Sequence, residues 1–537
     1  MDWARSAAEH GARYARLVLA VVESLDGQRH RSRRSCPRGR ALPDRLKVAG
    51  LPTLPRPRTR TLRLPTRDFF GVVVVIAWSV IALLFHEHFY DNYAVFASVV
   101  ILAAAVAFYR WEPAQGREGY RLLGFFVCGQ AFLSSGISVL NRVDVNPLLS
   151  TPTEEAFSAA VESTVVFALM FLLGALATSP RKGESLAHPP AVTSGPTRIV
   201  ALILAALTTL LTVSYLRSGP GPLGTLPLVF LNIGILGPTL VAQSALTGRR
   251  TIIPLAVLFL GQAIAVFYSS MLGLLVLPLR DLLLARIYLR KSLPMLLIGG
   301  MTAGVIILNP VKHLFRGAVA EGAPVGFDQT YAVWGDAVST TWNSQGHTQS
   351  DRKAGLESST SRLDYNWIAA HVFRTVPRRL PFEMGQTYAP LATILIPRVI
   401  YPDKPDSSEY GRGKWMVKLG VQTRAGTKTA AFALPAPAEA YWNFGWLGVF
   451  TVPVALGALV GLMLRWGPKD PVVRVGYVVL VATSLGQFLD MVIWIVPAFI
   501  AVAGSGIFTA FCSRIGKRAL RQKSKKASPP AIVAPAE

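Results

Sequence analysis

Long apolar stretches separated by short polar segments fill the chain from residue 69 to residue 511. A helix needs about 20 mostly apolar residues to cross the hydrocarbon core of a membrane. Twelve stretches approach this length, and we interpret each as a spanning helix: 69–85, 93–109, 122–140, 156–177, 199–216, 223–246, 252–267, 271–289, 293–309, 444–464, 475–489 and 491–511. The eighth contains Pro278, Arg280, Asp281 and Arg286, so it is predicted either to cross fully or to re-enter from one side.

Composition agrees with an all-α, polytopic membrane protein. Hydrophobic residues make up 51% of the 537 residues and charged residues only 16%, whereas soluble proteins have about 25% charged residues. The chain nevertheless has a net charge of +25. Much of it lies in two tails, because residues 1–67 hold 16 Lys and Arg against five acids, and residues 514–537 hold seven against one. We therefore attribute the charge to membrane orientation and expect no nucleic-acid partner.

The connecting segments predict the orientation. With the N-terminus inside, the five inner loops carry 13 Lys and Arg residues, and the five short outer loops carry only Arg142 and Arg217. This excess fits the positive-inside rule and predicts a multi-pass protein of the bacterial plasma (inner) membrane with both termini cytoplasmic. Removing the eighth span would put the basic C-terminal tail outside.

The predicted layout has five parts. A basic, disordered cytoplasmic tail (1–68) precedes transmembrane helices one to nine (69–309), and a passive role for this tail or binding of anionic lipid headgroups are both open. One large extracytoplasmic loop (310–443) is followed by helices ten to twelve (444–511) and a second basic cytoplasmic tail (512–537). The three cysteines, Cys36, Cys128 and Cys512, predict no disulfide or metal site.

The large loop carries the candidate chemistry. It faces away from cytoplasmic ATP and nucleotide sugars, and its 15 Lys and Arg against 11 acids suit an anionic, membrane-held substrate. A helix is predicted over 362–376, with Arg362 at its start. Asp364, His371 and Arg374 lie within an arc of roughly 80° on it. Either this is the solvated face of an interfacial helix, or it places an acid, an imidazole and a guanidinium over a substrate.

Rigid cations follow further along the loop. Three prolines between residues 397 and 405 fix an extended backbone that carries Arg398 and Lys404. Cations on stiff backbone suit a diphosphate, to which Arg can donate two parallel hydrogen bonds. Glu439 precedes the tenth span, where partial desolvation suits a general base. Glu439 is our first choice for that role, and His371 or Asp364 the second.

Three motifs in this loop resemble those of bacterial O-antigen polymerases, the Wzy-type oligosaccharide repeat-unit polymerases. They are Gly-Gln-Thr-Tyr at 385–388, Ile-Pro-Arg-Val-Ile-Tyr-Pro-Asp-Lys-Pro at 396–405 and Glu-Ala-Tyr-Trp-Asn-Phe-Gly-Trp-Leu-Gly at 439–448. With the span layout, the resemblance covers roughly residues 69–511. The stretch 269–273 departs from the family because it lacks an Arg that often occurs there.

The resemblance implies a fold similar to the GT-C membrane glycosyltransferases. It implies that glycan repeat units linked to undecaprenyl diphosphate are polymerised at the outer face of the membrane, without metal or cofactor. Partners would be the lipid-linked oligosaccharide and membrane lipids, with a chain-length regulator and a flippase as accessory proteins. The substrate-binding candidates are Arg398, Arg374, Arg362, Lys404, Tyr388, Tyr441 and Asn443.

Two other functions are compatible with the same residues. A ligase of related architecture would transfer the finished glycan from the same carrier to another acceptor, with nearly the same loop chemistry. A transporter or flippase should show internal repeats and charges near the membrane midplane, whereas ionisable residues here collect in the outer loop and at span ends.

Overall fold

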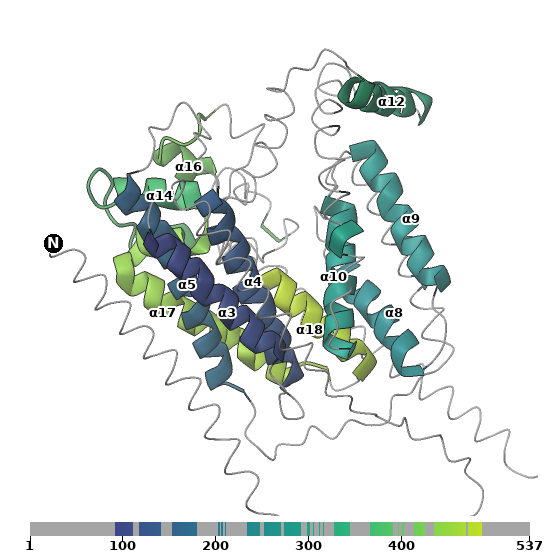
Figure 1. The fold of residues 1–537 in the computed structure, drawn as a ribbon, viewed down its shortest axis with the longest axis horizontal. Helices are drawn as coiled ribbons and strands as arrows, with labels where there is room; N and C mark the ends of the chain where they lie inside the picture. Colours follow the sequence, from purple (N-terminus) through teal and green to yellow (C-terminus); the bar gives the residue numbers. More distant parts are fainter. Residues whose placement is uncertain are drawn as a thin grey trace, which may run out of the picture. The chain divides into compact units, whose positions relative to one another are not determined.

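A computed structural model describes residues 92–110, 117–140, 153–179, 202–203, 206–207, 210, 233–247, 252–269, 273–290, 298–300, 304, 311, 315, 327–343, 366–389, 396, 400–401, 413–424, 434–468 and 471–485. They all belong to one unit, Thr66–Glu537. Every regular element in these ranges is a helix, which confirms the all-α class (Figure 1). The basic tails and the first and twelfth predicted spans lie outside the described residues, as do most of the fifth and the ninth.

Eight described helices lie over predicted spans. They are α3 (Asn92–Arg110), α4 (Glu118–Leu140), α5 (Glu154–Ala177), α8 (Ile233–Thr247), α9 (Ile252–Ser269), α10 (Gly273–Arg290), α17 (Ala436–Trp466) and α18 (Pro471–Leu485). The described parts of the loop add α12 (Phe327–Asn343), α14 (Asn366–Thr375), the short 3₁₀ helix η2 (Gln386–Tyr388) and α16 (Lys414–Lys418). By length and composition, α5 and α17 are the two described helices that could cross a membrane.

The closest helix pair is α5 with α17, and glycine makes the approach possible. A Cβ on Gly457 would collide with the carbonyl oxygen of Phe171, and one on Gly174 with that of Val454. A Cβ on Gly461 would collide with Thr178 in the same way. Gly457 meets Phe171, and Gly461, four residues later in α17, meets Thr178, seven residues later in α5. The two helices therefore run parallel. Small residues allow such contact between helix backbones.

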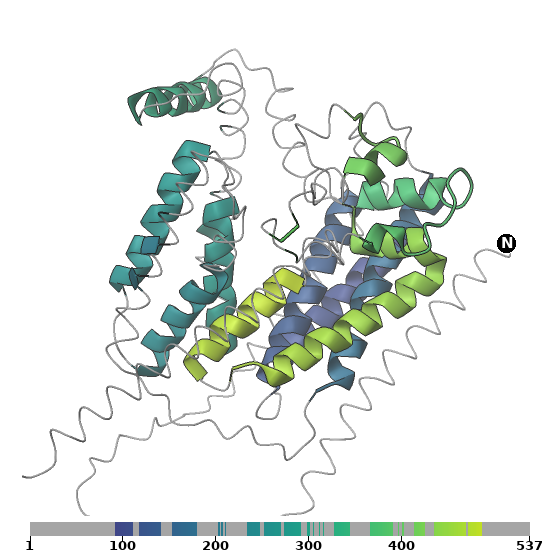
Figure 2. The same cartoon turned by 180° about the vertical axis from the view of Figure 1, so that it is seen from behind.

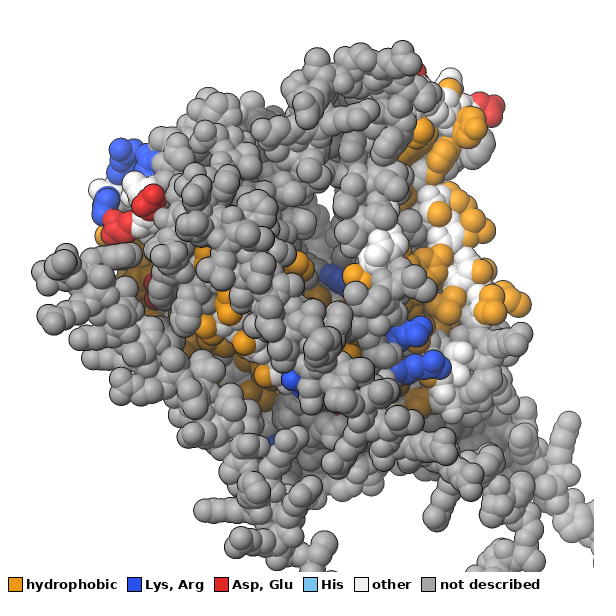
Figure 3. Space-filling view, in the orientation of Figure 1, with side chains coloured by type: hydrophobic (Ala, Val, Ile, Leu, Met, Phe, Trp, Pro, Cys, Tyr) orange, Lys and Arg blue, Asp and Glu red, His pale blue; other side chains and the backbone are white. Residues whose placement is uncertain are grey.

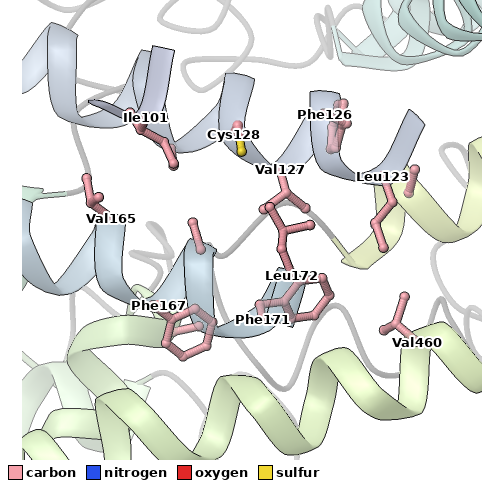
Figure 4. Packing of buried hydrophobic residues seen from close by; sticks show 14 of the residues in the cluster. Ile101, Leu123, Phe126, Val127, Cys128, Val165, Phe167, Phe171, Leu172 and Val460 are labelled. Atoms are coloured by element: carbon pink, nitrogen blue, oxygen red, sulfur yellow. The ribbon is translucent and has the colours of Figure 1, made fainter. Parts of the chain in front are cut away.

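A hydrophobic core surrounds this pair. Figure 4 shows Val127 of α4 pointing toward Leu172 and Phe171 of α5, and these side chains and Val460 of α17 are all buried. The core continues into α14, which packs on α5 and α17 and lies beside the start of α17 in both views (Figures 1 and 2). The helices therefore hold α14 of the large loop against α5 and the start of α17.

Buried polar side chains join helix ends. Arg121, at the start of α4, donates to the carbonyls of Ile287 and Tyr288 near the end of α10. Arg474, near the start of α18, donates to carbonyls of Leu464 and Pro468 at and just beyond the end of α17. Both arginines belong to the inner-loop charges that predict the orientation. The structure adds a second role, because each is 2–3% exposed and satisfies carbonyls that have no partner within their own helix.

A second set of bonds joins the opposite helix ends to the loop. Asn366, the first residue of α14, accepts from the Thr164 hydroxyl of α5 at 2.9 Å and donates to Ser138 of α4 at 3.0 Å. Trp334 of α12 donates its indole N–H to the carbonyl of Phe267, near the end of α9, at 2.8 Å. The ends of α4 and α9 and the start of α17 are therefore where the loop is attached.

Large apolar side chains also point outward from several helices. They include Leu133 of α4, Leu173 of α5, Ile252, Ile253 and Leu260 of α9 and Leu447 and Trp466 of α17, each more than half exposed. Figure 3 shows hydrophobic side chains along α9 on one face. Exposed apolar surface on this scale indicates contact with lipid or with another protein.

We expect Gly457→Ala to destabilise the protein, because the added methyl group meets the backbone of α5 and overpacking costs about 1–3 kcal/mol. The midpoint of thermal unfolding in detergent should fall. Gly129→Ala on α4 is the matched control, since open space surrounds that position and Ala favours helix. Equal midpoints for the two variants would contradict the close contact of α5 and α17.

Candidate functional site

Helix α17 is interrupted at Phe444 and Gly445. Gly445 has φ 64° and ψ −154°, a backbone conformation that essentially only glycine adopts. Three residues later, a Cβ on Gly448 would collide with the carbonyl oxygen of Ala440 across the bend. The two glycines of the 439–448 motif are therefore explained by a sharp break in the helix.

The break provides acceptors for a neighbouring segment. The carbonyls of Trp442 and Asn443 accept hydrogen bonds from the backbone N–H groups of Glu383 and Met384, at 3.0 and 3.2 Å. Met384 and Gly385 both have positive φ, and η2 follows them at once. The Gly385–Tyr388 segment is thus fixed on α17 where its first part ends.

Four residues form a buried polar cluster at this point. The Thr387 hydroxyl donates to Oε1 of Glu439 at 2.7 Å. The Asn443 side-chain nitrogen donates to the Thr387 hydroxyl at 2.6 Å and to the Glu439 carbonyl at 2.8 Å. The backbone N–H of Gly385 donates to Oδ1 of Asn443 at 2.8 Å. Glu439, Asn443 and Thr387 are at most 2% exposed, so their hydrogen bonds form away from water.

Tyr388 borders this cluster. Burial raises the pKa of its phenol well above the usual value, the negative charge of Glu439 raises it further, and the Asn443 side chain opposes them. The phenol therefore stays protonated at neutral pH and can donate a hydrogen bond. Its ring lies 6.3 Å from that of Phe444, which is 37% exposed.

A charged pair lies beside the cluster. The carboxylate of Glu383 is 3% exposed and accepts a hydrogen bond from the Lys418 ammonium, whose side chain is 37% exposed. The ammonium groups of Lys414 and Lys418 also lie 4.9 and 5.5 Å from the centre of the Trp415 ring. The pair joins α16 to Glu383, whose backbone N–H is hydrogen-bonded to α17.

The imidazole of His371 is hydrogen-bonded to a backbone carbonyl of the same chain. Its Nε2 lies 2.9 Å from the carbonyl of Leu419, which it can only approach as a donor. Burial lowers the pKa of His371 below its usual value. The charges of Arg374 and Arg379 lower it further, and the bond to Leu419 acts against them. His371 is therefore neutral at pH 7, and it attaches α14 to the segment that follows α16.

Tyr441 belongs to an aromatic cluster on the other side of the bend. Its ring centre lies 4.1 Å from that of Phe373, 6.1 Å from Phe382 and 6.0 Å from Trp446. These rings come from α14, the following turn and α17. The cluster gives the start of α17 a partly exposed aromatic face.

The structure brings together some of the predicted site residues. Glu439 and Asn443 belong to the buried cluster and Tyr388 borders it. Tyr441 lies on the neighbouring aromatic face, and His371 and Arg374 lie on α14. Four further candidates are outside the described residues: Asp364, Arg362, Arg398 and Lys404. Their roles stay predictions.

Sequence reasoning did not select Thr387, Glu383 or Lys418. Thr387 lies inside the 385–388 motif, so its polar side chain between Gly385 and Tyr388 was an available signal. Glu383 and Lys418 are 35 residues apart, and neither has a local pattern that points to the other.

The cluster offers a carboxylate that accepts a hydrogen bond and a protonated phenol beside it, and the Glu383–Lys418 ion pair belongs to the segment bonded to α17. These groups suit proton acceptance and the binding of an anionic or hydroxylated ligand. Among the described residues, no group of three or more His, Cys, Asp or Glu side chains is arranged to hold a metal ion.

Comparison of the chain with protein-family models, with characterised proteins and with solved structures finds no significant match.

The neutral state of His371 predicts a pH dependence of stability. The unfolded chain takes up a proton near the ordinary pKa of 6.5, and the folded protein takes it up only at lower pH. Stability should therefore fall as the pH drops below 6.5 toward the folded pKa. The thermal midpoint in detergent should fall by a few degrees more for wild type than for His371→Gln between pH 7.5 and 5.5. The same pH dependence in both proteins would contradict this.

Proposed function

We propose that the protein is a membrane glycosyltransferase that polymerises undecaprenyl-diphosphate-linked oligosaccharide repeat units into a surface polysaccharide, at the outer face of the bacterial plasma membrane. The observation that carries the proposal is the junction of two motifs about 50 residues apart. Glu439 and Asn443 from one motif, and Gly385 and Thr387 from the other, share a buried hydrogen-bonded cluster. Residues that resemble one enzyme family at separate places in the chain therefore meet at one site.

The directions of the helices support the predicted crossings. Since α5 and α17 run parallel, an odd number of crossings must separate them if both span a membrane. The sequence predicts five, and omitting the eighth would leave four. The contact of Arg121 with the end of α10 also agrees, because it joins two ends that the charge pattern assigns to the inner side.

The outward apolar side chains support a lipid environment for these helices. Between Glu439 and Arg465 the chain has no charged residue, a stretch long enough to cross the hydrocarbon core. The aromatic cluster around Tyr441 lies next to the start of this stretch. Aromatic rings of this kind are enriched where a helix leaves the hydrocarbon for the headgroups. The cluster at Glu439 would then lie at the membrane surface, within reach of a lipid-linked substrate.

The proposed reaction assigns a role to each group. Glu439 accepts the proton of the attacking hydroxyl, and a positioned base contributes about 10²–10⁴-fold in rate. Tyr388 donates a hydrogen bond to the substrate. Lys418 joins Arg374 and the predicted cations Arg398, Arg362 and Lys404 in stabilising the departing diphosphate, which is doubly anionic or more.

The test is transfer with defined substrate. Purified protein supplied with a synthetic undecaprenyl-diphosphate repeat unit should produce a ladder of longer glycans, read by gel or mass spectrometry. Glu439→Gln should reduce the rate at least about 100-fold, since it removes the base and retains the size of the side chain. Glu155→Gln is the matched control, because the Glu155 side chain is 85% exposed and its charge faces the exposed Arg378 at 3.9 Å and none of the cluster residues.

The outcomes separate the alternatives. A single transfer to a different acceptor, with no ladder, would favour a ligase. Movement of the lipid-linked unit across a vesicle membrane without transfer would favour a flippase. Activity of Glu439→Gln within threefold of wild type would remove Glu439 from the chemistry.

A further inference from the structure

We propose that Thr387 is a positioning residue that determines which oxygen of Glu439 takes up a proton. The part of this inference that concerns the reaction depends on the proposed function. The part that concerns the state of Glu439 depends on hydrogen-bond geometry alone, so the two can fail separately.

The direction of each hydrogen bond follows from one backbone group. The N–H of Gly385 can only donate, so the atom of Asn443 that faces it at 2.8 Å must be the amide oxygen. The amide nitrogen of Asn443 then faces Thr387 at 2.6 Å and can only donate to it. The Thr387 hydroxyl accepts this bond, and it donates its one proton to Oε1 of the ionised Glu439 at 2.7 Å.

An ionised Glu439 therefore accepts at Oε1. A hydrogen bond donated to a carboxylate favours its charged form, and in a buried site this bond opposes the cost of burying the charge. Any proton that Glu439 does take up is directed to its second oxygen, Oε2. Because of Thr387, Oε1 accepts a hydrogen bond and Oε2 is the oxygen that takes up a proton.

The arrangement is rigid because the fold fixes each member. The break at Gly445 makes the carbonyls of Trp442 and Asn443 available to accept from the N–H groups of Glu383 and Met384. These two bonds fix the position of the next N–H, that of Gly385. Thr387 is 1% exposed, and its branched side chain restricts rotation about χ1. A preorganised donor of this kind needs no rearrangement during a reaction.

In the proposed transfer, the acceptor hydroxyl loses its proton to Oε2 of Glu439. The hydroxyl oxygen forms a bond to the anomeric carbon of the growing chain as the bond from that carbon to the diphosphate oxygen breaks. The diphosphate leaves with the electron pair, so no further reactant is needed. Thr387 touches none of the reacting atoms and acts through Glu439.

The test uses dicyclohexylcarbodiimide, an apolar reagent that modifies protonated carboxyl groups, on the full chain in detergent. Labelling of the peptide that contains Glu439 is followed by mass spectrometry at pH 7. Thr387→Val preserves the shape and removes the hydroxyl, and it should raise the labelling rate about tenfold, which corresponds to about 1.4 kcal/mol. Thr387→Ser retains the hydroxyl and should label within threefold of wild type.

Three controls make the result specific. Glu439→Gln identifies labelling elsewhere in the peptide, and Glu155 serves as an exposed reference carboxyl group. A water-soluble carbodiimide shows whether Thr387→Val has simply opened the site, in which case both reagents would label faster. Unchanged labelling in Thr387→Val, or an equal rise in Thr387→Ser, would overturn the inference.

A kinetic readout ties the inference to the reaction. In the transfer assay, Thr387→Val should move the rising limb of the pH–rate profile to higher pH, and Thr387→Ser should restore it. A profile unmoved in Thr387→Val would overturn the catalytic part of the inference. Labelling as expected in a protein that shows no transfer under any condition would instead overturn the proposed function and leave the positioning of Glu439 intact.

Discussion

The backbone contact between α5 and α17 is the constraint on which the rest of the structure depends. Gly174, Gly457 and Gly461 allow these helices closer than any larger residue would, because a Cβ at each position meets the other helix. The contact fixes where α17 begins relative to α5, and Asn366 attaches α14 to α5 through Thr164. The candidate site is built on α17 within this frame, so its geometry follows from a packing contact that lies more than a turn away from it.

Carbonyl groups at helix ends need hydrogen-bond donors, and this requirement shapes both the packing of the helices and the candidate site. An unpaired backbone carbonyl in an apolar environment is costly, so each interruption of a helix needs a partner from elsewhere in the chain. At the end of α17 this partner is Arg474, and at the end of α10 it is Arg121. At the break in α17 it is the backbone of Glu383 and Met384, and that pairing places Thr387 against Glu439. One physical requirement thus produces a structural cap in two places and a candidate site in the third.

The sequence predicted the positions of helices well, because apolar stretches longer than 15 residues have few other stable forms. It placed the start of the tenth span at residue 444, whereas α17 begins at Ala436. Hydropathy detects the apolar part and cannot detect a helix that continues through a polar turn and a break. Glu439, Asn443 and Tyr388 could be selected because they lie in motifs. The pairing of Glu383 with Lys418 and the caps made by Arg121 and Arg474 could not, because each depends on residues that only the folded chain brings together.

The parallel pairing of α5 with α17 also has a consequence for biogenesis. Gly174 and Gly457 are separated by more than half of the chain, so their contact cannot form until most of the protein has been synthesised and inserted. Contacts between distant segments form late and slow folding. Until α17 arrives, the small-residue face of α5 has no helix against it, and an incomplete chain would present this face to other membrane proteins and to quality-control proteases. The same glycines that permit the final contact therefore make the assembly of the site one of the last steps in the maturation of the protein.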